Sequence, residues 1–142
     1  MRMTGEEARA RFAAARVARL ATADAGGRPH LVPIVFAVAG ERVVSAVDAK
    51  PKRTTSLRRL ANVRANPRVA LLADHYEDDW HALWWVRADG RGRVLEPGEP
   101  EAEEARAALS ERYEPYREGP PAGAVLVIDV ERWSGWRAAM SA

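Results

Sequence analysis

The sequence predicts a mainly β fold of the α+β class, with six to seven antiparallel strands and three helices in one domain spanning residues 1–142. Short runs rich in Val, Leu and Ile lie between Gly and Pro turn signals, which is the pattern of strands joined by hairpins. Three other segments carry apolar residues at helical spacing. Because the turns are short, we expect the strands to close into a barrel instead of forming a parallel sheet. A chain of 142 residues can bury a core of its own.

The first predicted helix covers residues 4–16. Thr4 is a good N-cap, and Glu7 follows three residues later, as in a capping box. Ala8 and Phe12 lie one helical turn apart and therefore share a face. We expect this face to pack on the sheet.

The apolar runs within residues 17–49 predict three strands in two hairpins. Gly26-Gly27 and Ala39-Gly40 supply the two turns. Pro33 lies inside the second strand and cannot donate a ladder hydrogen bond, so that strand should be an edge strand or carry a bulge.

The remaining elements alternate between helices and strands. In order they are a helix over 53–67 that ends at Asn66-Pro67, a strand over 68–74, a polar loop over 75–81, a long strand over 82–96 bent near Gly90 and Gly92, a helix over 99–113, a loop over 114–121, and an apolar strand within 124–138 followed by a second short strand after Gly135. The helix over 99–113 is acidic in its first turn, where the helix dipole favours negative charge.

Composition excludes several classes of protein. There is no cysteine, which excludes disulfides, thiolate metal sites and a cysteine nucleophile. The N-terminus is charged and lacks the apolar core of a signal peptide, so we expect a cytoplasmic protein that does not cross a membrane. The net charge of +2 permits an anionic ligand, but it does not call for nucleic acid. No stacking motif of an RNA-binding module is present.

The stretch "DAKPKRTTSLRRL", residues 48–60, contains both lysines of the chain, Lys50 and Lys52, followed by Arg53. These cations precede a predicted helix, whose first turn offers unpaired N–H groups and partial positive charge. Together they suit a phosphate group. The alternative is a solvated basic loop, and the stretch alone does not decide between the two.

The segment "RPHLVPIVFAVAGERVVSAVDAKPKRTTSLRRLANVRANPRVALL" resembles the pyridoxamine 5′-phosphate oxidase-like split β-barrel proteins, and more narrowly their branch of F420-dependent enzymes. The resemblance rests on three motifs in order: R-P-H-x-V-P, the cations after the third strand, and N-P-R-V-A-L-L. It implies an FMN-binding-like split barrel and a homodimer, with a flavin-type cofactor between the subunits.

The resemblance also implies which residues meet the cofactor. The third strand would run along it, the cations would hold its phosphate, and the second strand would line its ring. The residues at these places are Ser45, Ala46 and Val47, then Lys52 and Arg53 with Lys50 added, and then Pro33 and Val35.

The chain departs from the oxidase itself. Its second strand lacks the Arg-x-x-Leu-Leu-Lys pattern, and its end, "WRAAMSA", lacks the Arg-x-Arg that grips pyridoxamine phosphate. These departures argue against vitamin B6 chemistry. The resemblance therefore implies an F420-dependent oxidoreductase acting on a small molecule, with no catalytic side chain assigned. The alternatives are an FMN-binding oxidoreductase and a binding module for flavin, deazaflavin or heme without turnover.

Other residue clusters have simpler explanations. The loop over 75–81 groups His75, Glu77, Asp78, Asp79 and His81, which we interpret as a solvated acidic loop without a metal. His30 faces either the cleft or the surface. Most of the five tryptophans are expected to pack in the core or an interface, and adjacent Trp84 and Trp85 should point to opposite faces of their strand.

Overall fold

The computed structural model describes residues 1–47 and 54–138 of the chain. Within them it confirms the predicted fold class: seven antiparallel strands and four α-helices, with one short 3-10 helix. The elements are α1 (Gly5–Ala14), β1 (Ala18–Ala23), β2 (Pro29–Ile34), β3 (Ala37–Ala39), β4 (Arg42–Ala46), α2 (Thr54–Ala65), β5 (Arg68–His75), η1 (Trp80–Ala82), β6 (Trp84–Leu95), α3 (Pro100–Arg112), α4 (Glu114–Glu118) and β7 (Val125–Arg137). None of these helices combines the length and apolar character needed to cross a bilayer.

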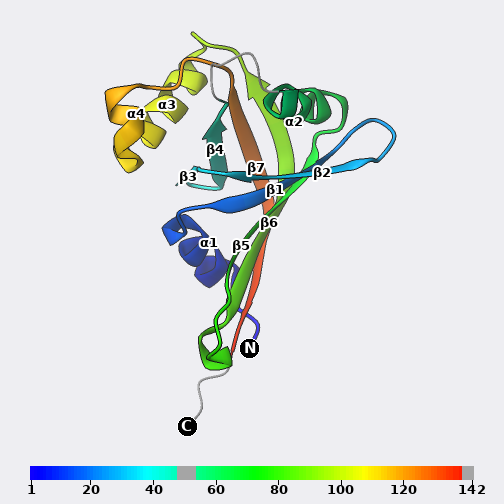
Figure 1. Cartoon of the computed structure of the whole chain (residues 1–142), viewed down its shortest axis with the longest axis vertical. Coiled ribbons are helices and arrows are strands. Elements are labelled where there is room, and N and C mark those ends of the chain that lie inside the picture. The colour runs from blue at the N-terminus through cyan, green and yellow to red at the C-terminus, as the bar shows by residue number, and fades with distance from the viewer. Residues whose placement is uncertain (48–53, 139–142) are drawn as a thin grey trace.

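The strands form a single sheet in the order β2-β1-β5-β6-β7-β4-β3. Figure 1 shows the long strands β6 and β7 running along the molecule, with α2 and the α3–α4 pair on opposite sides of their upper ends. The barrel is split, because the edge strands β2 and β3 do not pair with each other in the described part of the chain. Pro33 lies on edge strand β2, as its missing N–H predicted.

Three elements differ from the sequence prediction. The expected second strand is divided into β2 and β3 by a corner at Val35-Phe36. The expected loop over 114–121 contains helix α4, which begins next to Pro115. The expected final two strands are one, β7, because Gly135 is a packing glycine and not a turn. A Cβ there would lie 2.8 Å from the Met3 sulfur and 2.9 Å from the Trp85 carbonyl oxygen.

The predicted bend in the long strand is a β-bulge between β6 and β7. The register shifts between Asp89 and Gly90, so that Glu131 is the extra residue on β7. A Cβ on Gly90 would lie 2.2 Å from the Asp129 carbonyl oxygen, so only glycine fits at this close approach.

Two apolar clusters cover opposite parts of the sheet. The larger contains Phe12 of α1, which is fully buried against Phe36 and Trp133 at ring distances of 4.7 and 5.5 Å. The smaller joins α3, through buried Leu109, to β3, β4 and β7. Helix α1 begins as predicted, with the Thr4 hydroxyl accepting from the Glu7 N–H at 3.1 Å.

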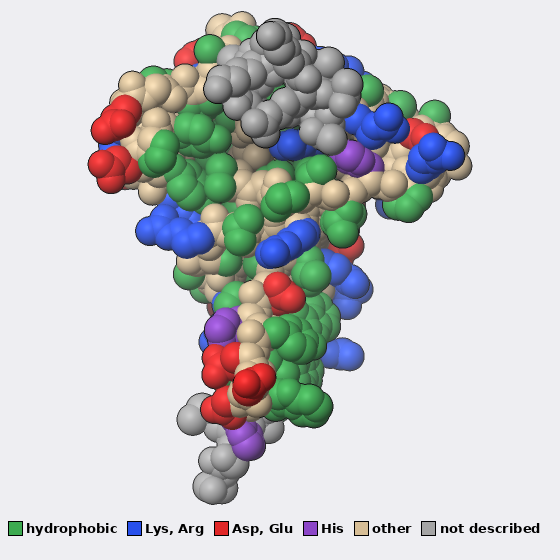
Figure 2. Space-filling model, in the orientation of Figure 1, with side chains coloured by type: hydrophobic (Ala, Val, Ile, Leu, Met, Phe, Trp, Pro, Cys, Tyr) green, Lys and Arg blue, Asp and Glu red, His purple; other side chains and the backbone are tan. Residues whose placement is uncertain are grey.

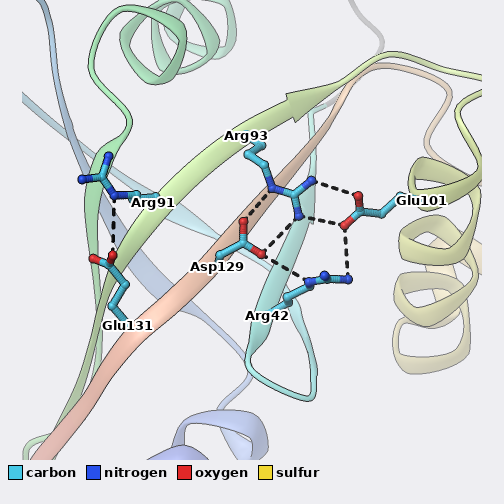
Figure 3. A network of polar contacts seen from close by, with 6 residues as sticks. All are labelled: Arg42, Arg91, Arg93, Glu101, Asp129 and Glu131. Carbon is cyan, nitrogen blue, oxygen red and sulfur yellow. Dashed lines mark hydrogen bonds and ion pairs between the residues drawn. The ribbon is translucent and has the colours of Figure 1, made fainter.

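Ion pairs fasten α3 to the sheet (Figure 3). The Arg93 guanidinium donates to both Glu101 carboxylate oxygens at 2.9 and 2.8 Å, and its Nε donates to Asp129 at 2.6 Å. Arg42 bridges the same two carboxylates, at 3.4 Å to Glu101 and 3.2 Å to Asp129. Four strand and helix residues therefore form one connected network, which holds α3 beside β4.

Candidate cofactor site

The corner between β2 and β3 is fixed by side chains from two other elements. The Ser45 hydroxyl, on β4, donates to the Val35 carbonyl oxygen at 2.9 Å. The Tyr113 hydroxyl accepts from the Phe36 N–H at 3.1 Å and lies 2.8 Å from the Phe36 carbonyl oxygen. Arg112 donates to the same carbonyl at 2.9 Å. These bonds satisfy backbone groups that lose their ladder partners where the strand breaks.

The residues predicted to line the cofactor gather around this corner. Ser45, Ala46 and Val47 are buried at the end of β4, at 2%, 7% and 6% exposure. Val35 is half-buried and Pro33 is exposed. Since the Ser45 hydroxyl is engaged by Val35, its direct effect in the structure is to hold the corner. Contact of these five residues with a cofactor stays a prediction.

The predicted phosphate ligands Lys50, Lys52 and Arg53 lie outside the described residues. Along the chain they follow β4, which ends at Ala46, and precede α2, which begins at Thr54. The three cations therefore belong to the connection between a buried strand and a helix of 12 residues. Their role as phosphate ligands stays a prediction.

Arg59 is a candidate site residue that the sequence analysis did not single out. It lies in α2 and is half-buried, and its Nε is buried without a hydrogen-bond partner among the described residues. Burial lowers the pKa of the guanidinium, while its charge interaction with Tyr116 of α4 raises it. A desolvated guanidinium nitrogen with no acceptor favours an incoming anion. In sequence Arg59 is one of two adjacent arginines in a helix, and nothing distinguished it from a solvated one.

Helix α2 is held on the sheet by a buried polar pair that the sequence analysis also missed. Asn62 donates from Nδ2 to the Thr22 hydroxyl of β1 at 3.1 Å, and both residues are buried. A buried amide needs such a partner. The only signal in sequence was an Asn beside apolar Leu60 and Val63, which does not reveal the distant partner.

The face of the sheet opposite the larger core carries two adjoining shallow cavities. The first, of about 410 Å³, lies over β1, β5 and β6 near the bulge. The second, of about 490 Å³, lies beside Leu31 and Leu72, whose side chains are 66% and 38% exposed. Ala21 and Ala70 line both cavities. This surface, which we call the outer trough, is apolar along its middle and open to solvent.

The tryptophans take several environments. Trp84 packs against the core. Its neighbour Trp85 points to the other face of the sheet, where Trp136 is its partner across the β6–β7 ladder, so the predicted alternation is confirmed. Trp133 packs on Phe12 as expected for a core residue. Trp80 is 75% exposed, so it lies outside the core of the single chain.

The acidic loop brings its histidines and carboxylates together in pairs. No group of three or more possible ligands occurs among the residues that the structure describes. Instead His75 contacts Glu77, and His81 contacts Asp79 at 3.2 Å. Figure 2 shows acidic side chains gathered at the lower end of the molecule, whereas arginine side chains lie along its middle and upper parts.

Comparison with known proteins places the chain in a family. The sequence pattern of pyridoxamine 5′-phosphate oxidase matches residues 4–137. No curated protein matches the sequence.

Solved structures share the fold. A FAD-binding protein from Mesorhizobium loti is 24% identical, with 98% of both chains covered and a TM-score of 0.76. The heme storage protein HutZ from Vibrio cholerae is 20% identical over 95% of both chains, with a TM-score of 0.71. The FAD-binding protein from Mycobacterium smegmatis is 20% identical, with 98% of this chain and 100% of that chain covered and a TM-score of 0.69. At these identities the likeness concerns the split-barrel fold. By the match over nearly its whole length, the chain belongs to the pyridoxamine 5′-phosphate oxidase family.

Proposed function

We propose that the chain is an oxidoreductase that binds coenzyme F420 and acts on a small organic substrate, with FMN or FAD as the alternative cofactor. The observation that carries the proposal is that β4, which is hydrogen-bonded to the β2–β3 corner, precedes the cationic stretch in the chain. Buried β4 is bonded to that corner through Ser45 and leads directly to Lys50, Lys52 and Arg53 before α2. A rigid strand followed by cations at a helix start is suited to a cofactor with a phosphate-bearing tail.

The described residues fit such a cofactor. The buried Arg59 Nε has no acceptor in the described structure, so an anion beside α2 would satisfy it. Beside the corner, half-buried Val35 and exposed Pro33 offer an apolar surface for the ring of the cofactor. When bound, reduced F420 would supply a hydride to an electron-poor C=C or C=N bond. The chain's own part is to hold the tail, to orient the ring against the corner and to exclude water.

We further propose that a second copy of the chain completes the site as a homodimer built on the outer trough. Exposed Leu31 and Leu72 flank an apolar strip formed by Ala21 and Ala70. An exposed apolar patch of this kind marks an interaction surface. A twofold dimer uses the same patch on both subunits, so a self-complementary apolar strip is suitable.

A binding module for heme is the second candidate, since HutZ shares the fold. The histidines of this chain argue against it. His75 and His81 are engaged by carboxylates. His30 lines a cavity of about 110 Å³, which is below the usual range for organic cofactors. In the described structure, therefore, none of the three histidines offers a free imidazole nitrogen, as an axial ligand to heme iron, next to a porphyrin-sized cavity.

Titration of the purified protein with F420, FMN, FAD and heme separates these functions. We expect saturable binding of F420, followed by oxidation of reduced F420 when a panel of enones is added. Binding of F420 without oxidation by any substrate would support a carrier role and contradict the enzyme. Stoichiometric heme binding with no affinity for F420 or flavins would overturn the proposal altogether.

A further inference from the structure

Arg106, on α3, is the one charged side chain among the buried residues that the structure describes, at 9% exposure. Its guanidinium donates two hydrogen bonds to backbone carbonyl oxygens, from Nη1 to Pro121 at 2.9 Å and from Nη2 to Gly123 at 2.6 Å. Its Nε has no hydrogen-bond partner among the described residues, and a carboxylate oxygen of Glu103 lies 3.8 Å from it. Arg106 therefore ties α3 to the segment that leads into β7.

The burial of this guanidinium is costly, because a charged group loses its contact with water. Its two hydrogen bonds go to neutral carbonyls, and one of its N–H groups stays unpaired in the described structure. Replacing a buried charge with an apolar side chain of similar volume is often neutral or stabilising. Stability alone therefore gives little reason for an arginine here, whereas the geometry imposed by its two bonds does.

The carbonyls that Arg106 binds belong to a segment without regular structure. Residues 119–124 read Gly-Pro-Pro-Ala-Gly-Ala and lie between the end of α4 and the start of β7. The two prolines have no N–H to donate, and the two glycines allow many backbone conformations. The segment thus has few means of fixing itself, and the fork of Arg106 supplies two fixed points.

This segment in turn holds the end of β4. The Ala124 carbonyl oxygen accepts from the Val47 N–H at 3.1 Å, one residue beyond the end of the β4–β7 ladder. Val47 is buried and leads into the cationic stretch. A path of hydrogen bonds and one peptide bond therefore runs from Arg106 through Gly123 and Ala124 to Val47.

We propose that Arg106 is a positioning residue for the cofactor site, because it fixes the place at which the chain leaves β4 toward Lys50, Lys52 and Arg53. This inference rests on the proposed function, in which those three cations hold the cofactor tail. A β4 end that is already in place spares the cofactor the free energy of ordering it. The planar guanidinium suits this role because it donates two bonds in a fixed fork, which a lysine ammonium does not.

Amide hydrogen exchange, measured by NMR on the full chain without a cofactor, tests the positional effect. In Arg106→Met and in Arg106→Lys, exchange of the Val47 N–H should rise about tenfold relative to that of the Val44 N–H. Val44 lies within β4 and pairs with both β3 and β7, so general destabilisation would raise both rates together. A parallel rise at the two residues, or no change at Val47, would overturn the proposal.

Fluorescence titration with F420 tests the effect on binding. Arg106→Lys keeps the charge, yet it should weaken binding about tenfold, because the cofactor binds only the fraction of molecules whose β4 end is in place. Arg117→Met is the matched control and should bind like the wild type. Arg117 also donates to two backbone carbonyls, those of Ser110 and Glu111 at 3.4 and 2.7 Å, but these lie on α3 and not in the segment before β7.

Equal F420 affinity in the wild type and in folded Arg106→Lys would contradict the positioning role. A wild-type protein that binds neither F420 nor a flavin would instead refute the proposed function. The exchange measurement needs no cofactor, so it would still decide whether Arg106 holds the end of β4. The two failures are therefore distinguishable.

Discussion

The hydroxyl of Ser45 donates a 2.9 Å hydrogen bond to the carbonyl oxygen of Val35, joining β4 to the corner where the predicted second strand breaks. Ser45 is 2% exposed, so this carbonyl has no ready replacement partner in water. The bond links the strand that leads to the cationic stretch with the strand expected to line the cofactor ring. Two residues that the sequence analysis grouped by resemblance alone are thus in direct contact.

Ser45→Ala should lower the free energy of unfolding by about 1–3 kcal/mol, because it leaves the partly buried Val35 carbonyl without its hydrogen bond from Ser45. Urea denaturation measures the change. Ser134→Ala is the matched control, since the Ser134 hydroxyl is also buried but has no partner among the described residues. A loss as large in the control as in Ser45→Ala would show that the hydrogen bond is not the cause.

Gly90→Ala should destabilise the protein by more than about 3 kcal/mol and broaden the unfolding transition, because the added Cβ would lie 2.2 Å from the Asp129 carbonyl oxygen. The bulge would have to open to make room. Gly26→Ala is the control, because the nearest atom to its Cβ is Asp24 Oδ1 at an ordinary 3.5 Å. Thermal unfolding that is similar for both variants would contradict the close approach.

Acid should weaken the attachment of α3. The hydrogen bonds from Arg93 hold the pKa of Glu101 and of Asp129 below their usual values of 4.5 and 3.8. A depressed carboxyl pKa stabilises the fold above the unfolded-state pKa, and this contribution is lost as pH falls through the folded-state pKa. Stability should therefore fall as pH drops below about 4.5, and salt should reduce the effect because these groups are partly exposed.

Arg93→Met tests the origin of that acid sensitivity. We expect lower stability at pH 7 and a flatter decline below pH 4.5, measured by denaturation at a series of pH values. Arg64→Met removes an exposed pair with Glu96 and should leave the pH profile unchanged. An Arg93→Met profile as steep as that of the wild type would assign the acid sensitivity to other groups.

Arg59→Met should weaken cofactor binding about tenfold without lowering the melting temperature. Its partly buried guanidinium has an unpartnered Nε in the described structure, so replacing it with an apolar side chain of similar length removes a desolvation cost. The same replacement removes a donor to an anion. Calorimetry for stability and fluorescence titration for affinity are needed together. A large fall in melting temperature would show that Arg59 is a structural residue.

Leu31→Arg should convert the proposed dimer into a monomer, because it places a charge in the apolar strip of the outer trough. Light scattering at micromolar concentration reports the change. Tyr76→Arg is the control, since Tyr76 is 69% exposed but lies on the acidic loop away from the trough. A wild-type protein that is itself monomeric would refute the dimer directly.

Local sequence patterns predicted the strands and the first three long helices because each carries a complete signal of its own. Thr4 and Glu7 mark the start of α1, and Asn66-Pro67 marks the end of α2. Pro33 identified an edge strand through its missing donor. The division of β2 from β3 could not be predicted, because it depends on Ser45, Arg112 and Tyr113, which are distant in sequence.

Packing glycines and turn glycines look alike in sequence. The sequence analysis interprets Gly135 as a turn, but Gly135 lies inside the continuous strand β7. Its missing side chain leaves room there for the side chain of Met3. The same limit applies to the candidate site. Resemblance grouped Val35 with Ser45, but the exceptional environments of Arg59 and His30 follow from burial without partners, which no local pattern encodes.

The most direct test of the proposed function is the affinity of F420 for the wild type and for the Lys52→Ala/Arg53→Ala double variant, measured by fluorescence at two salt concentrations. Charge-assisted bonds to phosphate contribute about 1.5–3 kcal/mol each, so we expect affinity to fall at least tenfold, with the difference shrinking as salt rises. Arg64→Ala/Arg117→Ala, which removes the same charge from exposed positions, should bind like the wild type. Equal affinity in the Lys52→Ala/Arg53→Ala variant, with an unchanged melting temperature, would contradict the assignment of this stretch to the cofactor phosphate.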